Sequence, residues 1–174
     1  MAILRVRKFG DPILRRRAER VREVTPQVRA TLRDMIDTMY AEVGIGLAAT
    51  QVGIPLRMLV VDEEKGRGPR ALVNPEVVEH GGLVVAEEGC LSIPGIFGDV
   101  ARAEWVRVTA TSEDGDGVQL DARGLLARVI QHEVDHLDGI LFIDRLDPML
   151  RDRIKRQIRR EGLPENAPHR AFAL

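Results

Sequence analysis

Apolar residues recur at helical spacing in two long stretches of the chain. In the first, Thr25 and Pro26 are typical of a helix start, because the hydroxyl can cap free backbone amides and proline has no N–H to leave unpaired. The apolar positions that follow are Val28, Leu32, Met35, Ile36, Met39, Tyr40 and Val43. This spacing predicts an amphipathic helix that ends at Gly44.

The second helical stretch has a broad apolar stripe, and His132 and His136 fall on its buried side. The apolar positions are Leu125, Leu126, Val129, Ile130, Val134 and Leu137. Gly139 predicts the helix end, because glycine readily takes the left-handed conformation of a helix cap. A basic helix with few apolar positions is expected over residues 151–160, and the last ten residues are expected to be frayed.

Short apolar or alternating runs between these helices predict β-strands. They cover residues 56–61, 71–73, 77–78, 83–85, 105–111 and 118–120. The turn at His80-Gly81-Gly82 is expected to close a hairpin, as is the turn over residues 113–117. Because the links are short, we predict an α+β fold of mostly antiparallel short-strand sheets, packed around the histidine helix with N-terminal and C-terminal helices. Residues 1–174 are expected to form a single catalytic domain.

Composition and charge exclude several classes of function and partner. Lys and Arg number 26 against 27 Asp and Glu, so no general positive field favours nucleic acid, and no sequence-specific nucleic-acid partner is expected. No apolar run is long enough for a signal peptide or a membrane span, which predicts a cytoplasmic protein without membrane contact. The chain has one cysteine, Cys90, which excludes internal disulfides and multi-cysteine zinc modules.

The chemistry centres on the sequence His132-Glu133-Val134-Asp135-His136. Histidines four residues apart on a helix can bind one metal ion, and the glutamate next to the first can move protons. The alternative is chance spacing, with a hydrogen-bonded core histidine. Two unpartnered imidazoles are costly to bury, so the pattern favours a metal site, whose third ligand this stretch leaves open.

Two further stretches combine glycines with polar side chains. Residues 44–53 hold glycines and alanines that allow close approach to the backbone, but they lack the pattern of a phosphate loop. Gln51 closes this stretch and could either cap a turn or donate to an oxyanion. Residues 87–95 hold two acids, a glycine and Cys90, which favours a strand end.

These three stretches resemble the three signature motifs of the peptide deformylases, in the same order and with similar separations. Residues 11–14 and the last helix resemble that family too. The resemblance implies a metal-dependent hydrolase that removes the N-formyl group from the formyl-methionine terminus of newly made polypeptides and releases formate. The partner it implies is the N-terminus of a nascent polypeptide.

The resemblance also implies the role of each site residue. Cys90, His132 and His136 would bind one divalent metal ion, Fe2+ in the cell, with Zn2+, Ni2+ or Co2+ as substitutes. Glu133 would transfer protons, and Gln51 and the backbone N–H of Leu91 would stabilise an oxyanion. The residues expected to bind substrate are Gly44, Ile45, Gly46, Gly89, Leu125 and Val129.

Two positions depart from the family pattern. Phe97 stands where many members carry an arginine, so that contact is either absent or supplied by Arg102. Arg128 stands where some relatives have an aliphatic residue. Its stem is expected to line the side-chain slot while its head reaches solvent.

Three other properties of the sequence bear on function. A metallopeptidase, the common owner of this histidine pattern, takes a downstream histidine or glutamate as third ligand, but His169 lies in the expected frayed tail and Glu161 follows a surface helix. A non-catalytic relative would have lost Glu133, Gln51 or Cys90. The basic C-terminal helix either contacts the ribosome, as in related bacterial enzymes, or packs on the body as a solvated helix.

Overall fold

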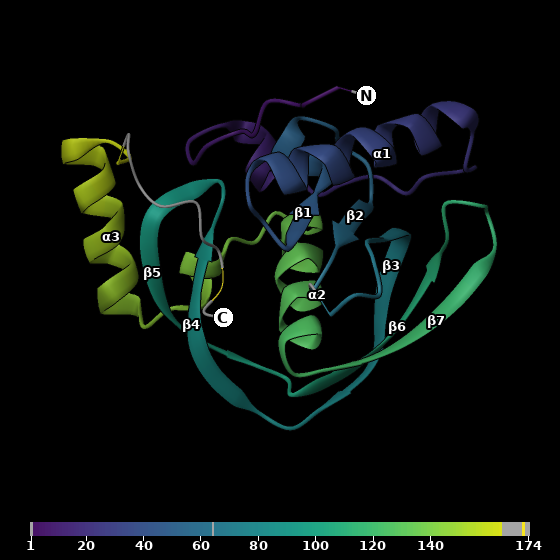
Figure 1. Cartoon of the computed structure of the whole chain (residues 1–174). Helices are drawn as coiled ribbons and strands as arrows, with labels where there is room; N and C mark the ends of the chain where they lie inside the picture. Colours follow the sequence, from purple (N-terminus) through teal and green to yellow (C-terminus); the bar gives the residue numbers. More distant parts are fainter. Residues whose placement is uncertain (1, 64, 165–171, 173–174) are drawn as a thin grey trace.

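The computed structural model describes residues 2–63, 65–164 and 172 of the chain, which contain three α-helices and seven strands (Figure 1). The helices are η1 (Pro12–Arg15), α1 (Pro26–Ala41), η2 (Ala49–Val52), α2 (Gly124–Leu137), η3 (Phe142–Arg145) and α3 (Pro148–Glu161), where η marks a 3-10 helix. The strands are β1 (Gly46–Ala48), β2 (Met58–Val61), β3 (Arg70–Gly81), β4 (Val84–Cys90), β5 (Ile93–Arg102), β6 (Trp105–Thr111) and β7 (Gly117–Arg123). No helix in this part of the chain is both long and apolar enough to cross a bilayer.

The strands form two antiparallel sheets. One has five strands in the order β1-β2-β3-β6-β7, and the other is the two-stranded ribbon β4-β5. Figure 1 shows α2 in the middle, with the five-stranded sheet on one side and the β4-β5 ribbon and α3 on the other. The predicted α+β fold of antiparallel sheets around the histidine helix is confirmed.

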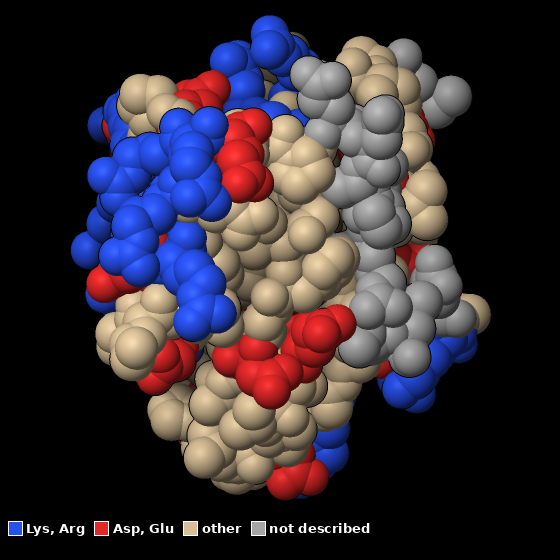
Figure 2. All heavy atoms as spheres, turned by 90° about the vertical axis from the view of Figure 1, so that its left-hand side faces the viewer, with Lys and Arg blue, Asp and Glu red and all other residues tan. Residues whose placement is uncertain are grey.

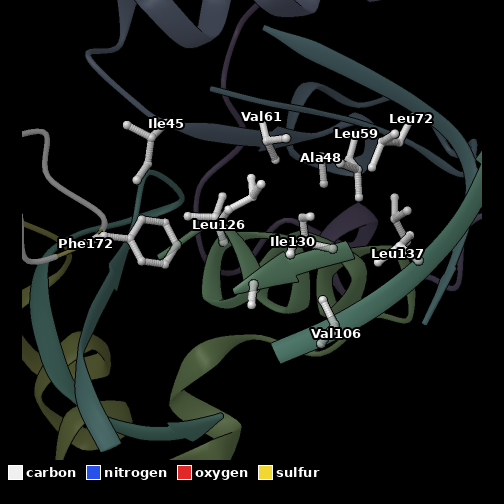
Figure 3. Packing of buried hydrophobic residues seen from close by; sticks show 14 of the residues in the cluster. Ile45, Ala48, Leu59, Val61, Leu72, Val106, Leu126, Ile130, Leu137 and Phe172 are labelled. Carbon is white, nitrogen blue, oxygen red and sulfur yellow. The ribbon is translucent and has the colours of Figure 1, made fainter. Parts of the chain in front are cut away.

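Strand β2 is buried on both faces and separates two apolar clusters. Met58 and Val60 face the cluster that contains α1, whereas Leu59 and Val61 face the cluster that contains α2. This division follows from the two-residue period of a strand. Figure 3 shows Leu59 and Val61 pointing towards Ile130 of α2. A continuous apolar run in the sequence therefore became a strand with helices over both faces.

A third cluster connects Cys90 to the C-terminal part of the chain. It includes Ile93 of the ribbon, Phe142 of η3 and Ile154 of α3. The burial of Ile154 therefore fixes α3 against the ribbon that presents the cysteine.

Two local predictions were wrong. The turn at His80 to Gly82 does not close a hairpin, because Gly81 pairs with Trp105 in the large sheet while Val84 pairs with Arg102 in the ribbon. Here the chain crosses from one sheet to the other, which short-range turn signals cannot show. Helix α1 ends at Ala41 rather than Gly44. Val43 takes a left-handed conformation (φ 55°), and the Gly44 amide donates to the Met39 carbonyl at 2.9 Å, as in a Schellman cap.

The expectation of a frayed C-terminus was wrong for Phe172. This side chain is 3% exposed and belongs to the same apolar cluster as α2. Figure 3 shows its ring beside Ile45 and Leu126. Residues 165–171, 173 and 174, including His169, lie outside the described residues.

Candidate metal centre

Three side chains from two separate elements meet beside α2. His132 and His136 stand one turn apart on the helix, and Cys90 ends strand β4. The Cys90 Sγ lies 3.3 Å from His136 Nε2, which in turn lies 3.3 Å from His132 Nε2. All three side chains are buried, and their ligand atoms lie within 4.8 Å of one another. The structure therefore brings together the three predicted ligands.

The donor set fits one divalent ion. A tetrahedral ion with ligand distances of about 2.0–2.3 Å separates neighbouring donors by roughly 3.3–3.7 Å. The two printed separations, both 3.3 Å, agree with this spacing. Two imidazole nitrogens that face each other at this distance cannot both present bare lone pairs, so either a proton or a metal ion must lie between them. Thiolate and imidazole donors suit iron and zinc alike.

Glu88 fixes the orientation of His132. Its carboxylate lies 2.9 Å from His132 Nδ1, so the Nε2 atom is left to face the cysteine and His136. Burial raises the pKa of Glu88, but hydrogen bonds with His132 and Arg102 outweigh it and hold that pKa well below its usual range. Arg102 donates to both carboxylate oxygens at 2.9 and 3.0 Å, and Arg128 adds a bond of 2.6 Å. Glu88 is therefore an ionised carboxylate in a fully buried position.

The pKa values of the two histidines shift in opposite directions. Burial lowers the pKa of His132, but hydrogen bonds with Cys90 and Glu88 outweigh it and raise that pKa to about 10. Burial, together with the nearby charge of His132, lowers the pKa of His136 well below its ordinary value. The two imidazoles therefore have different electrostatic surroundings, although they stand one turn apart on α2.

Glu133 lies against the backbone of β1 with one oxygen unused. A Cβ atom added to Gly46 would lie 2.7 Å from Glu133 Oε1, so only glycine lets the strand approach this closely. The other oxygen, Oε2, is buried without a hydrogen-bond partner among the described residues. Burial raises the pKa of Glu133 to about 7, although the charge of His132 opposes the shift. A carboxylate with this pKa and a free oxygen can exchange protons near neutral pH.

Gln51 presents its amide nitrogen to the metal cluster. Its Oε1 accepts from the Ala48 backbone N–H at 2.9 Å, which fixes the orientation of the amide. Its Nε2 lies 3.2 Å from Ser92 Oγ and 3.5 Å from Cys90 Sγ. Leu91 follows Cys90 directly and is buried. Gln51 and Leu91 therefore both lie next to the cysteine, and their role as oxyanion donors stays a prediction.

The predicted substrate residues come from two strand edges and the helix between them. Gly44 and Ile45 lead into β1, which begins at Gly46 and is one of the two edge strands of the large sheet. Gly89 belongs to β4 of the ribbon. Leu125 and Val129 of α2 pack in the same apolar cluster as Ile45. The three apolar residues therefore lie together, while the three glycines lie in or next to β1 and β4.

The expectation for Arg128 was wrong. Arg128 is 6% exposed and does not reach solvent, because its guanidinium donates to Glu88 and to the carbonyls of Val84 and Val100. For the contact that Phe97 cannot make, two alternatives were given, absence or supply by Arg102. The donors of Arg102 are engaged with Glu88 and with Asp135, the latter at 2.6 Å, inside the protein, which favours absence.

Among the described residues, one group of three histidine, cysteine or acidic side chains is close enough to hold a metal ion, and it contains Cys90. The third ligand that a metallopeptidase needs is absent from that group. A model of the polypeptide deformylase family matches residues 3–152. The chain belongs to the polypeptide deformylase family.

Relatives and solved structures agree with this membership. The peptide deformylase of Pseudoalteromonas translucida is 49% identical over 163 residues, which cover 93% of this chain and 98% of that protein. The peptide deformylase of Halothermothrix orenii is 48% identical, with 84% of this chain and 95% of that protein covered. A crystal structure of the Synechococcus elongatus peptide deformylase with actinonin superposes with a TM-score of 0.85 at 42% identity, covering 95% of this chain and 91% of that one.

Two residues that contact His132, Glu88 and Phe172, were not predicted from the sequence. Glu88 was assigned only to a strand end, although an acid two positions before a metal-binding cysteine was the available signal. Phe172 gave no signal, because a lone aromatic residue in a short polar tail has no periodicity to interpret.

Proposed function

We propose how the residues of this chain carry out the deformylation that defines its family. The substrate is a newly made polypeptide with an N-terminal formyl-methionine, and the products are formate and a free amine. The observation that supports this most directly is the buried Cys90–His132–His136 cluster with the unpartnered Oε2 of Glu133 beside it. The metal-peptidase alternative is not favoured, since the third ligand is a cysteine from a separate strand.

A divalent ion held by Cys90, His132 and His136 would supply Lewis acidity, which makes water a stronger nucleophile at neutral pH. We propose Fe2+ in the cell, with Zn2+, Ni2+ or Co2+ as substitutes, because thiolate and imidazole donors bind all four. Glu88 keeps His132 in the tautomer that points Nε2 inward.

Glu133 takes a proton from the attacking water and returns it to the amine nitrogen when the bond from the formyl carbon to that nitrogen breaks. The Gln51 amide and the Leu91 backbone N–H donate to the oxygen that becomes negatively charged. Because Ala48 and Ser92 hold the Gln51 amide in place, little reorganisation is needed at that moment.

The peptide binds in extended form between the edges of β1 and β4, with backbone contacts at Gly44, Gly46 and Gly89. Its methionine side chain enters the slot lined by Ile45, Leu125 and Val129. The buried position of Ile45 and its shared cluster with Val129 support this assignment.

Formate release from formyl-Met-Ala-Ser by the anaerobically purified, iron-loaded protein tests the function. We expect rapid turnover of this peptide, and very slow turnover of acetyl-Met-Ala-Ser and of peptides whose only cleavable bonds are internal. Cleavage of internal peptide bonds at a comparable rate would contradict the proposal.

The location and partners of the protein are also proposals. We propose that residues 1–174 act as one catalytic domain, and the packing of α3 against the Cys90 cluster supports this. We also propose that the protein acts in the cytoplasm.

Figure 2 views the side that carries α3 and shows Lys and Arg side chains gathered over one part of this face. The exposed bases of α3 include Arg153, Arg156 and Arg160. They support contact with ribosomal RNA, near the emerging substrate.

A further inference from the structure

Phe172 lies where the proposed function puts the substrate side chain. Its ring is 5.0 Å from the ring of His132, centroid to centroid, in an edge-to-face arrangement with an interplanar angle of 69°. It shares an apolar cluster with Ile45 and Val129, and with Leu125 at the margin of that cluster. Figure 3 shows the ring directed towards Ile45 and Leu126. A side chain of the protein itself, Phe172, therefore lies among the residues that the proposed function assigns to the substrate side chain.

The backbone at Phe172 also occupies a substrate position. Phe172 forms an antiparallel β-bridge with Glu88, the residue next to Gly89. Glu88 already pairs with Gly98 of β5 on its other side, so the bridge uses the remaining edge of β4. An extended peptide that adds to a strand edge with its side chain in a pocket is a common form of peptide recognition. Phe172 shows both features.

The ring of Phe172 also borders open space. A cavity of about 220 Å³ lies beside it and is bordered by Leu125, Arg128 and Ala86. Arg128 is held at this cavity by its bonds to Glu88 and to the Val84 carbonyl. Phe172 therefore lines a cavity on one side, and its departure would enlarge a pocket that already exists next to Leu125.

We infer that Phe172 is an internal ligand of the side-chain slot and competes with the first residue of the substrate. The inference rests on the proposed function, which assigns the slot and the β4 edge to the peptide. It identifies the ligand class of the slot as a peptide with a large apolar side chain, aromatic ones included. Occupation of the slot by Phe172 lowers the fraction of protein that is ready to bind substrate, and the apparent KM rises by the inverse of that fraction.

Phe172→Ala in the full-length, metal-loaded protein tests the inference. If Phe172 occupies the slot about 70–90% of the time, the variant should lower KM for formyl-Met-Ala-Ser about 3- to 10-fold, with kcat within about two-fold. Met149→Ala is the control, since Met149 is an apolar side chain of α3 that is 76% exposed and should leave KM unchanged. An unchanged or raised KM in Phe172→Ala would overturn the inference and make Phe172 a packing residue.

A synthetic peptide of residues 165–174 provides a second test that does not depend on turnover. Added to Phe172→Ala, it should bind with measurable heat by calorimetry and inhibit competitively, whereas the same peptide with alanine in place of the phenylalanine should do neither. Absence of binding in a protein that deformylates normally would refute the inference alone. Binding of the peptide in a protein that releases no formate from any substrate would support the inference and refute the proposed function.

Discussion

At the scale of single residues, the site depends on how buried charges are matched. Glu88 carries a negative charge at a position with no solvent exposure and faces three partners, Arg102, Arg128 and His132. Arg102 continues the network to Asp135 on α2. The same carboxylate therefore sets the His132 tautomer and ties the ribbon to the helix. Glu133 is different, because one of its oxygens has no hydrogen-bond partner in the described structure and is available for chemistry.

Glu133→Gln should separate metal binding from catalysis. The amide cannot take a proton from water, so formate release should fall by about 100- to 10,000-fold. Metal analysis should still find one ion per chain, because Glu133 is not a ligand. In Cys90→Ala, by contrast, the ion itself should be lost. Substantial turnover in Glu133→Gln would remove the glutamate from the mechanism.

Glu88→Gln should destabilise the fold strongly. Loss of the carboxylate leaves the buried charges of Arg102 and Arg128 without their partner, which costs about 3–5 kcal/mol of unfolding free energy. Urea unfolding of the metal-loaded proteins measures the difference. The matched control is Glu113→Gln, an exposed glutamate between β6 and β7, which should change stability by less than about 0.5 kcal/mol. Similar stabilities for the two variants would show that the buried network contributes little.

At the scale of elements, the histidine helix is held firmly at its C-terminal end. Gly139 has φ 75°, and a Cβ atom there would lie 2.5 Å from the Arg15 carbonyl oxygen, so only glycine fits. The chain then enters η3, whose first turn is capped by Asp144 through the Leu141 backbone N–H at 2.9 Å. Arg15 of η1 pairs with the same carboxylate. These contacts connect η1 and η3 to the C-terminal end of α2.

Asp144→Asn should reveal the strength of this connection through its pH dependence. Burial raises the pKa of Asp144, but hydrogen bonds from Arg15 and the Leu141 N–H outweigh it and lower that pKa below the usual value. A lowered folded-state pKa stabilises the protein above the unfolded pKa of about 3.9, and the stabilisation is lost as pH falls through the folded value.

We therefore expect Asp144→Asn to lose about 1 kcal/mol of unfolding free energy at pH 7, with the difference from the parent shrinking below about pH 4. Denaturant unfolding at a series of pH values measures this. Asp114→Asn, in the exposed β6–β7 turn, is the control and should track the parent throughout. A difference that is constant with pH would show that the charge of Asp144 is not its contribution.

At the scale of the whole molecule, α3 has two faces with different tasks. Ile154 is 6% exposed and packs in the cluster that contains Cys90, with Leu150 and Ile158 beside it. Removal of the helix would therefore disturb the metal centre as well as any surface contact. Arg153 and Arg156 are exposed and can be changed without touching that cluster.

Charge reversal at Arg153 and Arg156 should weaken binding to ribosomes while leaving deformylation of a free tripeptide unchanged. The expected result is lower co-sedimentation with ribosomes and a shallower dependence on salt, because fewer phosphates are neutralised. The control is Arg22→Glu with Arg67→Glu, which makes the same change in net charge at exposed positions outside α3. Equal loss of binding in both double variants would indicate a general charge effect without docking by α3.

Much of the architecture could be predicted because it depends on local patterns. The Thr25 cap and the apolar period after it predict α1, and the Thr25 side chain does accept from the Val28 N–H. The alternation in β6 and the turn after it predict a hairpin with β7, which the structure contains. The partners of β3 and β4 could not be predicted. Strand β3 pairs with β6 and β4 pairs with β5, and the choice between two sheets depends on packing that no short stretch encodes.

By itself, the sequence determined the elements, the histidine pair on one face of α2 and the family resemblance, because helix period, caps and motif spacing are all local along the chain. Only the tertiary structure decided that Arg128 points inward to Glu88, that Glu88 orients His132 and that Phe172 returns to the slot. The physical reason is that these contacts join residues 40 or more positions apart. Whether a charge or a ring is buried depends on which partners the fold brings to it.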